Sequence, residues 1–220
     1  MTKIFFTSDI HLSHRAICAF SPSRIKIFGL DSKYSEQEVV ANHALLKNDK
    51  TDPVIRKSVK AFFEQLILDM DRAIIELWND TVGFSDEVYV LGDISFAREE
   101  ATAKFLERMH GRIYLVRGNH DKGTDRLDRF EWVKDYHRAT IDGHSVVMFH
   151  YPIFEWDGMH HGSFHLYGHV HGKDVPYGGR CMDVAPESTK KIAVEWTDVK
   201  RELIKREVRT HHDAEREQSY

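Results

Sequence analysis

Residues 112–121 have the sequence RIYLVRGNHD, in which an apolar, β-rich run passes directly into glycine, asparagine, histidine and aspartate. The run at residues 112–116 predicts a buried strand. The polar segment that follows places Asn119 and His120 just beyond the carboxyl end of this strand. In α/β sheets, ligands and catalytic groups gather at such strand ends. The stretch therefore predicts an α/β protein with its functional site at the end of a strand.

The same arrangement recurs along the chain. Apolar runs at residues 4–7, 87–91, 145–149 and 164–167 predict strands, and each passes into aspartate or histidine. Because several strands end in this way, we expect their ends to converge. The chemistry-bearing residues at these ends are Asp9, His11, Asp93, Asn119, His120, His150, His169 and His171.

The other elements frame these strands. Ser35 and Glu38 form a capping-box pattern at the start of one helix, and Pro53 suits the first turn of the next. Apolar residues at helical spacing support the second helix and a third one. The helices are expected at residues 35–46, 53–78 and 97–110, and closing strands at residues 180–184 and 191–195.

Length and composition predict a single domain over residues 1–220. We expect a helical insertion at about residues 20–80 and a charged carboxyl-terminal tail from about residue 198. The hydrophobic share of 41% and charged share of 30% are those of an ordinary globular protein.

Charge and cysteine content narrow the class of protein. The net charge of −4 disfavours a protein that coats nucleic acid. No apolar run approaches the roughly 18 residues of a membrane span. Only two cysteines are present, too few for a disulfide framework. The sequence therefore predicts a cytoplasmic protein without a membrane partner, as a monomer or homodimer.

The strand-end residues supply carboxylate, amide and imidazole donors but no thiolate. Such a set suits Mn²⁺, Fe, Zn²⁺, Ni²⁺ or Co²⁺ better than a calcium site or a cysteine-lined zinc site. One ion does not need so many ligands. Seven of them divide into two sites if one carboxylate bridges, so we expect two divalent ions.

The ordered motifs resemble the calcineurin-like metallophosphoesterase superfamily, in a compact bacterial or phage-type branch. They are Asp9-Ile-His11, Gly92-Asp93, Gly118-Asn119-His120-Asp121, His150 after an apolar strand, and Gly168-His169-Val170-His171. Any one motif is weak, whereas all five in order are highly specific. The resemblance implies an α/β fold, a four-layer αββα sandwich of two mixed sheets with helices outside.

The resemblance also implies the role of each ligand. Asp9, His11 and His171 would bind one ion, while Asn119, His150 and His169 would bind another, and Asp93 would bridge them. Mn²⁺ is the favoured ion. A hydroxide that bridges the metals would attack phosphorus in line with the leaving oxygen.

His120 is expected to be catalytic, pointing at the substrate rather than at a metal. The resembling family often pairs this histidine with an acid at the position that Phe96 holds here. Asp121 or Asp125 could supply the missing acid.

Two further residues are candidates for substrate binding. His14 could touch the substrate phosphate, or could cap the helix that follows it. Arg117 could bind phosphate bidentately, or could belong to a structural ion pair.

These features predict a dinuclear phosphoesterase that hydrolyses a phosphodiester or phosphomonoester of a small, nucleotide-like substrate. One alternative is a nuclease on single-stranded nucleic acid. Another is a catalytically silent scaffold of the same fold, although such proteins usually lose ligands that this chain retains.

Overall fold

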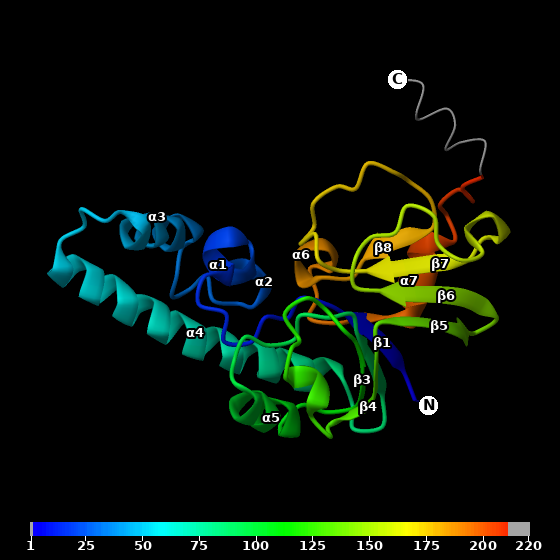
Figure 1. The fold of residues 1–220 in the computed structure, drawn as a ribbon, viewed down its shortest axis with the longest axis horizontal. Coiled ribbons are helices and arrows are strands. Elements are labelled where there is room, and N and C mark those ends of the chain that lie inside the picture. The colour runs from blue at the N-terminus through cyan, green and yellow to red at the C-terminus, as the bar shows by residue number, and fades with distance from the viewer. Residues whose placement is uncertain (1, 211–220) are drawn as a thin grey trace.

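In the computed structural model, which describes residues 2–210, nine strands form two mixed sheets. The first sheet has the order β4-β3-β2-β1-β9, and the second has the order β5-β6-β7-β8. Figure 1 shows the sheets at one end of the molecule and a helical arm at the other. The predicted α/β sandwich of two mixed sheets is confirmed.

The first sheet aligns three of the predicted site strands. Strands β1 to β4 are parallel neighbours, and β9 pairs with β1 in the antiparallel sense. The carboxyl ends of β1, β2 and β3 therefore meet at one edge, where Asp9, Asp93 and Asn119 follow them. The bounds are β1 (Ile4–Thr7), β2 (Glu87–Val90), β3 (Arg112–Val116), β4 (Phe130–Lys134) and β9 (Val194–Glu195).

The second sheet carries the histidine-bearing strands. Strands β6, β7 and β8 are parallel, so His150 and His169 emerge at the same edge, while β5 forms an antiparallel hairpin with β6. The bounds are β5 (Tyr136–Ile141), β6 (His144–Phe149), β7 (Phe164–Tyr167) and β8 (Cys181–Asp183).

Apolar side chains fill the space between the sheets. Phe6 of β1, Val116 of β3 and Leu166 of β7 belong to this cluster and are fully buried. Helix α7 (Trp196–Leu203) adds Val199 and Leu203 to it. The segment expected to begin the charged tail therefore starts as a packed helix, and residues 211–220 lie outside the described part of the chain.

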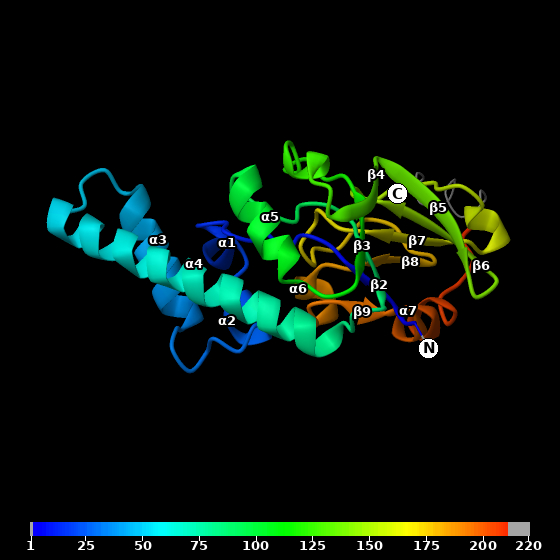
Figure 2. The ribbon, with the colours of Figure 1, turned by 90° about the horizontal axis from the view of Figure 1, so that it is seen from below.

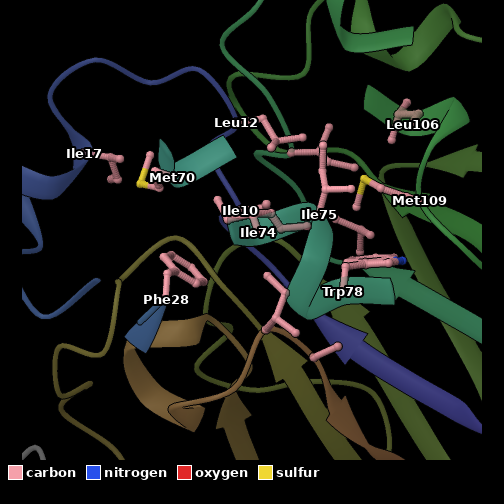
Figure 3. Close-up of a cluster of buried hydrophobic side chains, with 14 of the residues drawn as sticks. Ile10, Leu12, Ile17, Phe28, Met70, Ile74, Ile75, Trp78, Leu106 and Met109 are labelled. Carbon is pink, nitrogen blue, oxygen red and sulfur yellow. The ribbon is translucent and has the colours of Figure 1, made fainter. Parts of the chain in front are cut away.

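Helices α4 (Pro53–Thr81) and α5 (Glu99–Glu107) cover the outer face of the first sheet. Figure 3 shows Ile74, Ile75 and Trp78 of α4 packed in one cluster with Ile10 and Leu12. The outer face of the second sheet is covered mainly by loops and the short 3₁₀ helix η2 (Met159–His161).

A helical arm separates β1 from β2. It consists of α1 (Ile17–Phe20), α2 (Arg24–Ile27), α3 (Glu36–Lys47) and α4. The 29 residues of α4 span about 44 Å at 1.5 Å per residue. Figures 1 and 2 show that one half of α4 packs on the sheet while the other projects outward with α3. No helix among the described residues is long and apolar enough to cross a membrane.

Side-chain caps explain where the two long helices of the arm begin. The Ser35 hydroxyl accepts a hydrogen bond from the Glu38 amide at 3.1 Å, and Asp52 accepts one from the Val54 amide at 2.8 Å. The predicted helices at residues 35–46 and 53–78 are thus confirmed to within three residues. The helix predicted at residues 97–110 is shorter at both ends, since α5 runs from Glu99 to Glu107 and the Ala97 amide donates to the Ser95 hydroxyl in a turn before it.

Strands β4 and β5 were not predicted. They are the edge strands of the two sheets, and only Asp135 separates them. Exposed residues interrupt both strands, so neither presents a continuous apolar run. This edge carries the chain from one sheet to the other.

Candidate metal centre

The residues expected to bind metal have an unusual backbone conformation. Among the described residues, eight that are not glycine have positive φ, and five of these are predicted ligands. Such conformations cost about 1–3 kcal/mol each and persist where the surrounding structure enforces them, often at functional sites. The five are Asp9, His11, Asp93, His169 and His171, with φ between 52° and 71°.

Backbone hydrogen bonds hold two of these loops together. The Asp9 amide donates to the Gly92 carbonyl at 2.9 Å, and the His11 amide donates to the Asp93 carbonyl at 3.0 Å. A third bond joins the Leu12 amide to the Ile94 carbonyl at 3.0 Å. The loops after β1 and β2 are therefore fixed side by side.

The first donor group consists of Asp9, His11 and His171. The Nε2 atoms of His11 and His171 lie 3.2 Å apart, and Asp9 Oδ1 lies 3.7 Å and 3.5 Å from them. Asp9 Oδ2 accepts the His169 amide at 2.8 Å, but Oδ1 is buried and has no hydrogen-bond partner. Buried polar atoms are normally satisfied, so this oxygen fits a cation.

Glu187 settles which nitrogen of His171 is available. His171 Nδ1 donates to Glu187 Oε1 at 2.9 Å, so in the neutral imidazole Nε2 carries a lone pair rather than a proton. This lone pair faces His11 and the unpartnered oxygen of Asp9. A cation beside His171 Nε2 and Asp9 Oδ1 would therefore find two acceptors free to bind it.

The second donor group lies around His150. Its Nδ1 donates to the Leu91 carbonyl at 2.7 Å, which leaves Nε2 as an acceptor in the neutral ring. This Nε2 faces Asn119 Oδ1 at 3.0 Å and Asp93 Oδ2 at 3.7 Å. The His169 ring lies 5.2 Å from the His150 ring, between centroids. Donor atoms of Asp93, Asn119 and His150 therefore come together, and the His169 ring lies beside them.

Asp93 contacts both groups. Its Oδ1 accepts the His120 amide at 2.9 Å, which fixes the carboxylate. Its Oδ2 lies 3.9 Å from His11 Nε2 and 3.7 Å from His150 Nε2, one nitrogen of each group. Asp9 also lies near Asp93 and His150, so the two groups are contiguous.

The surroundings of Asp9 and His11 lower the pKa values of both side chains, and so favour the unprotonated forms that bind metal. Burial alone would raise the pKa of Asp9, but the nearby His11, His171 and His150 hold it below its ordinary value. Burial lowers the pKa of His11, and so favours its neutral, ligating form. Burial opposes protonation of His171 too, but the hydrogen bond to Glu187 and the charges of Asp9 and Glu187 together outweigh it and raise the pKa of His171.

Two buried residues that sequence reasoning missed support the first group. Arg24 of α2 is fully buried, and its Nε donates to Glu187 Oε1 at 2.7 Å. It also donates to the Ile10 carbonyl at 2.8 Å and to the Asp9 carbonyl. This ion pair and His171 hold the pKa of Glu187 far below its usual range although burial opposes them. The helical arm thus reaches the metal centre through Arg24.

We expect Glu187→Gln to weaken one metal ion selectively. The change weakens the acceptor that orients His171, and losing such a contact typically costs 10- to 100-fold in metal affinity. Titration calorimetry with Mn²⁺ should show one weakened site and one unchanged site. Glu100→Gln, on an exposed glutamate of α5, is the control. Equal weakening of both sites would contradict this role.

Close packing explains a glycine of the final motif. A Cβ at Gly168 would lie 2.3 Å from Asp9 Oδ2 and 2.4 Å from the Ser8 hydroxyl oxygen. We expect Gly168→Ala to displace Asp9 and to lower Mn²⁺ affinity at least about ten-fold. Gly178→Ala, where a Cβ meets nothing within 4 Å, should bind Mn²⁺ normally in the same titration. Unchanged affinity in Gly168→Ala would show that Asp9 is not held by this contact.

His120 lies beside the donor groups without joining them. Its side chain is 44% exposed, and its Nε2 lies 4.0 Å from Asp93 Oδ2. Its ring packs on Phe96, with 4.5 Å between centroids. The Phe96 ring therefore contacts the His120 ring. Phe96 occupies the position where the family that the chain resembles often has an acid.

Neither acid considered as a partner for His120 contacts it in the described structure. The Asp121 oxygens accept the amides of Asp93, Ile94 and Gly118 at 2.7–3.0 Å, so this carboxylate organises two site loops. Asp125 forms an ion pair with Arg117.

The structure separates the two candidates for substrate binding. His14 lines the site, and its ring stacks on Phe96 at 4.0 Å. Burial lowers the pKa of His14 to about 4, so it is uncharged near neutral pH and does not attract phosphate by charge. Arg117 forms ion pairs with Asp125, at 2.9 Å, and with Asp135. It is thus engaged in the structural ion pair considered as the alternative.

A cavity of about 420 Å³ opens onto both donor groups. Five predicted ligands and His120 line one side of it, and the rest of its lining comes mostly from the arm and the loop after β2. The five are His11, Asp93, Asn119, His169 and His171.

Carboxylate, amide and imidazole donors gathered at the strand ends of an α/β sandwich form a candidate site for divalent metal ions. The chain belongs to the calcineurin-like phosphoesterase family, whose sequence profile matches residues 2–215.

Two individual proteins match about half of the chain at 28% and 33% identity. An uncharacterized protein of Methanocaldococcus jannaschii is 28% identical over 109 residues, which are 49% of this chain and 56% of that protein. The chain thus spans little more than half the length of this relative. The gene 66 protein of Mycobacterium phage D29 is 33% identical over 137 residues, covering 49% of this chain and 68% of the phage protein.

A solved structure shares the fold. A protein of unknown function from Aquifex aeolicus superimposes with a TM-score of 0.60 at 18% identity. The match covers 92% of this chain and 100% of that one.

Proposed function

We propose that this metal-dependent phosphoesterase is dinuclear and hydrolyses a small, nucleotide-like phosphate ester. The observation that carries the proposal is the pair of contiguous donor groups with Asp93 facing both. Asp9, His11 and His171 would hold one ion, Asn119, His150 and His169 the other, and Asp93 both. Mn²⁺ is the ion favoured by the family resemblance, and the same oxygen and nitrogen donors accept iron, zinc, nickel or cobalt.

In this proposal the metal ions and the protein side chains have different roles. When bound, the two cations supply a nucleophile by lowering the pKa of water, and they neutralise charge on the phosphoryl oxygens. The protein fixes the donors through Glu187, Leu91 and the paired loops. The His120 side chain is exposed to the cavity. As an imidazolium it would stabilise phosphoryl charge or give its proton to the leaving oxygen.

A substrate screen with Mn²⁺, paired with metal analysis, tests this function. It compares p-nitrophenyl phosphate, bis-p-nitrophenyl phosphate, 2′,3′- and 3′,5′-cyclic nucleotides, and single-stranded oligonucleotides. We expect two ions per chain and turnover of small esters, with a preference for diesters. Turnover of oligonucleotides alone would make the protein a nuclease, and two bound ions without any turnover would make it a silent scaffold.

A further inference from the structure

Beside the predicted ligands, part of the cavity wall is aromatic and apolar. Phe20 and Phe96 line it together with His14 and Ile17. We call Phe20, Phe96 and His14 the aromatic wall. A single cavity therefore brings polar donors and exposed aromatic rings next to one another.

Both phenylalanines of the wall are exposed. Phe20 is 60% exposed and Phe96 is 39% exposed. Leaving apolar area in water costs about 25 cal/mol per Å². Exposed aromatic rings that face a polar site are typical of a surface that a ligand covers.

The wall is held in place by its surroundings. The Phe96 amide donates to the Leu12 carbonyl at 2.8 Å, which ties Phe96 to the loop that carries His11. His14 stacks on one side of the Phe96 ring at 4.0 Å and 11°. The Phe20 ring packs edge-on against His43 of α3 at 5.3 Å. Lys47 Nζ lies over the same ring, 5.5 Å from its centroid. Such fixed rings form a preorganised platform.

We propose that the aromatic wall is a subsite for the base of a nucleotide whose phosphate lies at the metal centre, an inference that rests on the proposed function. A nucleobase offers a planar face to rings, and its phosphate offers oxygens to cations. The cavity volume of about 420 Å³ lies within the range of pockets for small molecules. Lys173 lines the same cavity and supplies a positive charge for the anionic part of the ligand.

The arm thereby acquires a role in specificity. Phe20, His43 and Lys47 all belong to the segment between β1 and β2, and they lie on α1 and α3. Phe96 follows β2 and packs on His120 as well. Phe20 is therefore the better residue to test, because its replacement leaves the ring contact of His120 in place.

The test measures binding of adenosine 5′-monophosphate, uridine 5′-monophosphate and ribose 5-phosphate to the Mn²⁺-loaded full chain by titration calorimetry. Stacking of a base on an aromatic ring is worth about 1–3 kcal/mol, so the nucleotides should bind at least about five-fold more tightly than the sugar phosphate. Phe20→Ala should reduce this preference to less than about two-fold and leave affinity for ribose 5-phosphate unchanged. Phe20→Tyr keeps a ring and should keep the preference.

Phe84→Ala is the matched control, since Phe84 is 80% exposed and lies outside this cavity. It should behave as the wild type does. Equal affinity for nucleotides and ribose 5-phosphate in the wild type, or an undiminished preference in Phe20→Ala, would overturn the subsite. If the small esters of the screen are still turned over, the proposed function then stands. If the wild-type protein binds two ions but turns over none of the esters in the screen, that result contradicts the proposed function itself.

Discussion

We expect His120→Ala to lower turnover by about 100- to 10,000-fold while both metal ions remain bound. The reason lies in the position of His120. Its amide fixes Asp93, but its side chain is exposed to the cavity and its Nε2 is 4.0 Å from the Asp93 carboxylate. Alanine keeps the amide and removes only the group that would serve the substrate.

Steady-state kinetics together with metal analysis by mass spectrometry would measure this effect. His161→Ala removes an exposed histidine of η2, which does not line the cavity at the predicted ligands, and should change neither quantity. If His120→Ala lost one ion, His120 would have to be reassigned as a ligand. Unchanged turnover would remove it from the chemistry.

The second large effect is expected at Asp93. Asp93→Asn keeps the shape of the side chain but removes the negative charge that faces both donor groups. Replacing a residue that supports a ligand already costs 10- to 100-fold in metal affinity. We therefore expect both ions to bind at least about 100-fold more weakly, and turnover at limiting Mn²⁺ to disappear.

Asp86 provides a matched control. It is a buried aspartate at the opposite end of β2, where it accepts the Lys3 and Gly83 amides at 2.9 Å. Asp86→Asn should leave metal affinity unchanged in a Mn²⁺ titration. Loss of a single ion in Asp93→Asn would argue that this carboxylate belongs to one site only.

The central part of the fold was predictable because its signal is local. Each site strand is an apolar run that ends in a chemistry-bearing residue, as in β3 before Asn119 and β7 before His169. Parallel pairing then brings those ends to one edge of each sheet. The structure brings all seven expected ligands together with His120, although their assignment to particular ions stays a prediction.

The supporting contacts had no such local signal. Arg24 and Glu187 are 163 positions apart, and each looks like an ordinary charged residue in the sequence. Only the fold shows that both are buried beside His171. The aromatic wall was missed for the same reason, since Phe20 ends helix α1 and Phe96 lies in the loop after β2. The sequence left two roles for Arg117, phosphate binding and a structural ion pair. It could not choose between them because Asp135, one of the ion-pair partners, follows the unpredicted strand β4.

The path of Arg24 has a consequence for any attempt to simplify this protein. The outer half of α4 and the helix α3 project away from the sheets. Shortening both helices would therefore be an obvious way to make a smaller protein. Yet α2, in the same insertion, contributes a guanidinium to the interior of the catalytic body. A trimmed chain without residue 24 would leave Glu187 as a buried charge without its counter-ion, and leaving a buried charge unpaired typically costs 3–5 kcal/mol. The insertion therefore stabilises the buried surroundings of His171, in addition to forming the projecting arm.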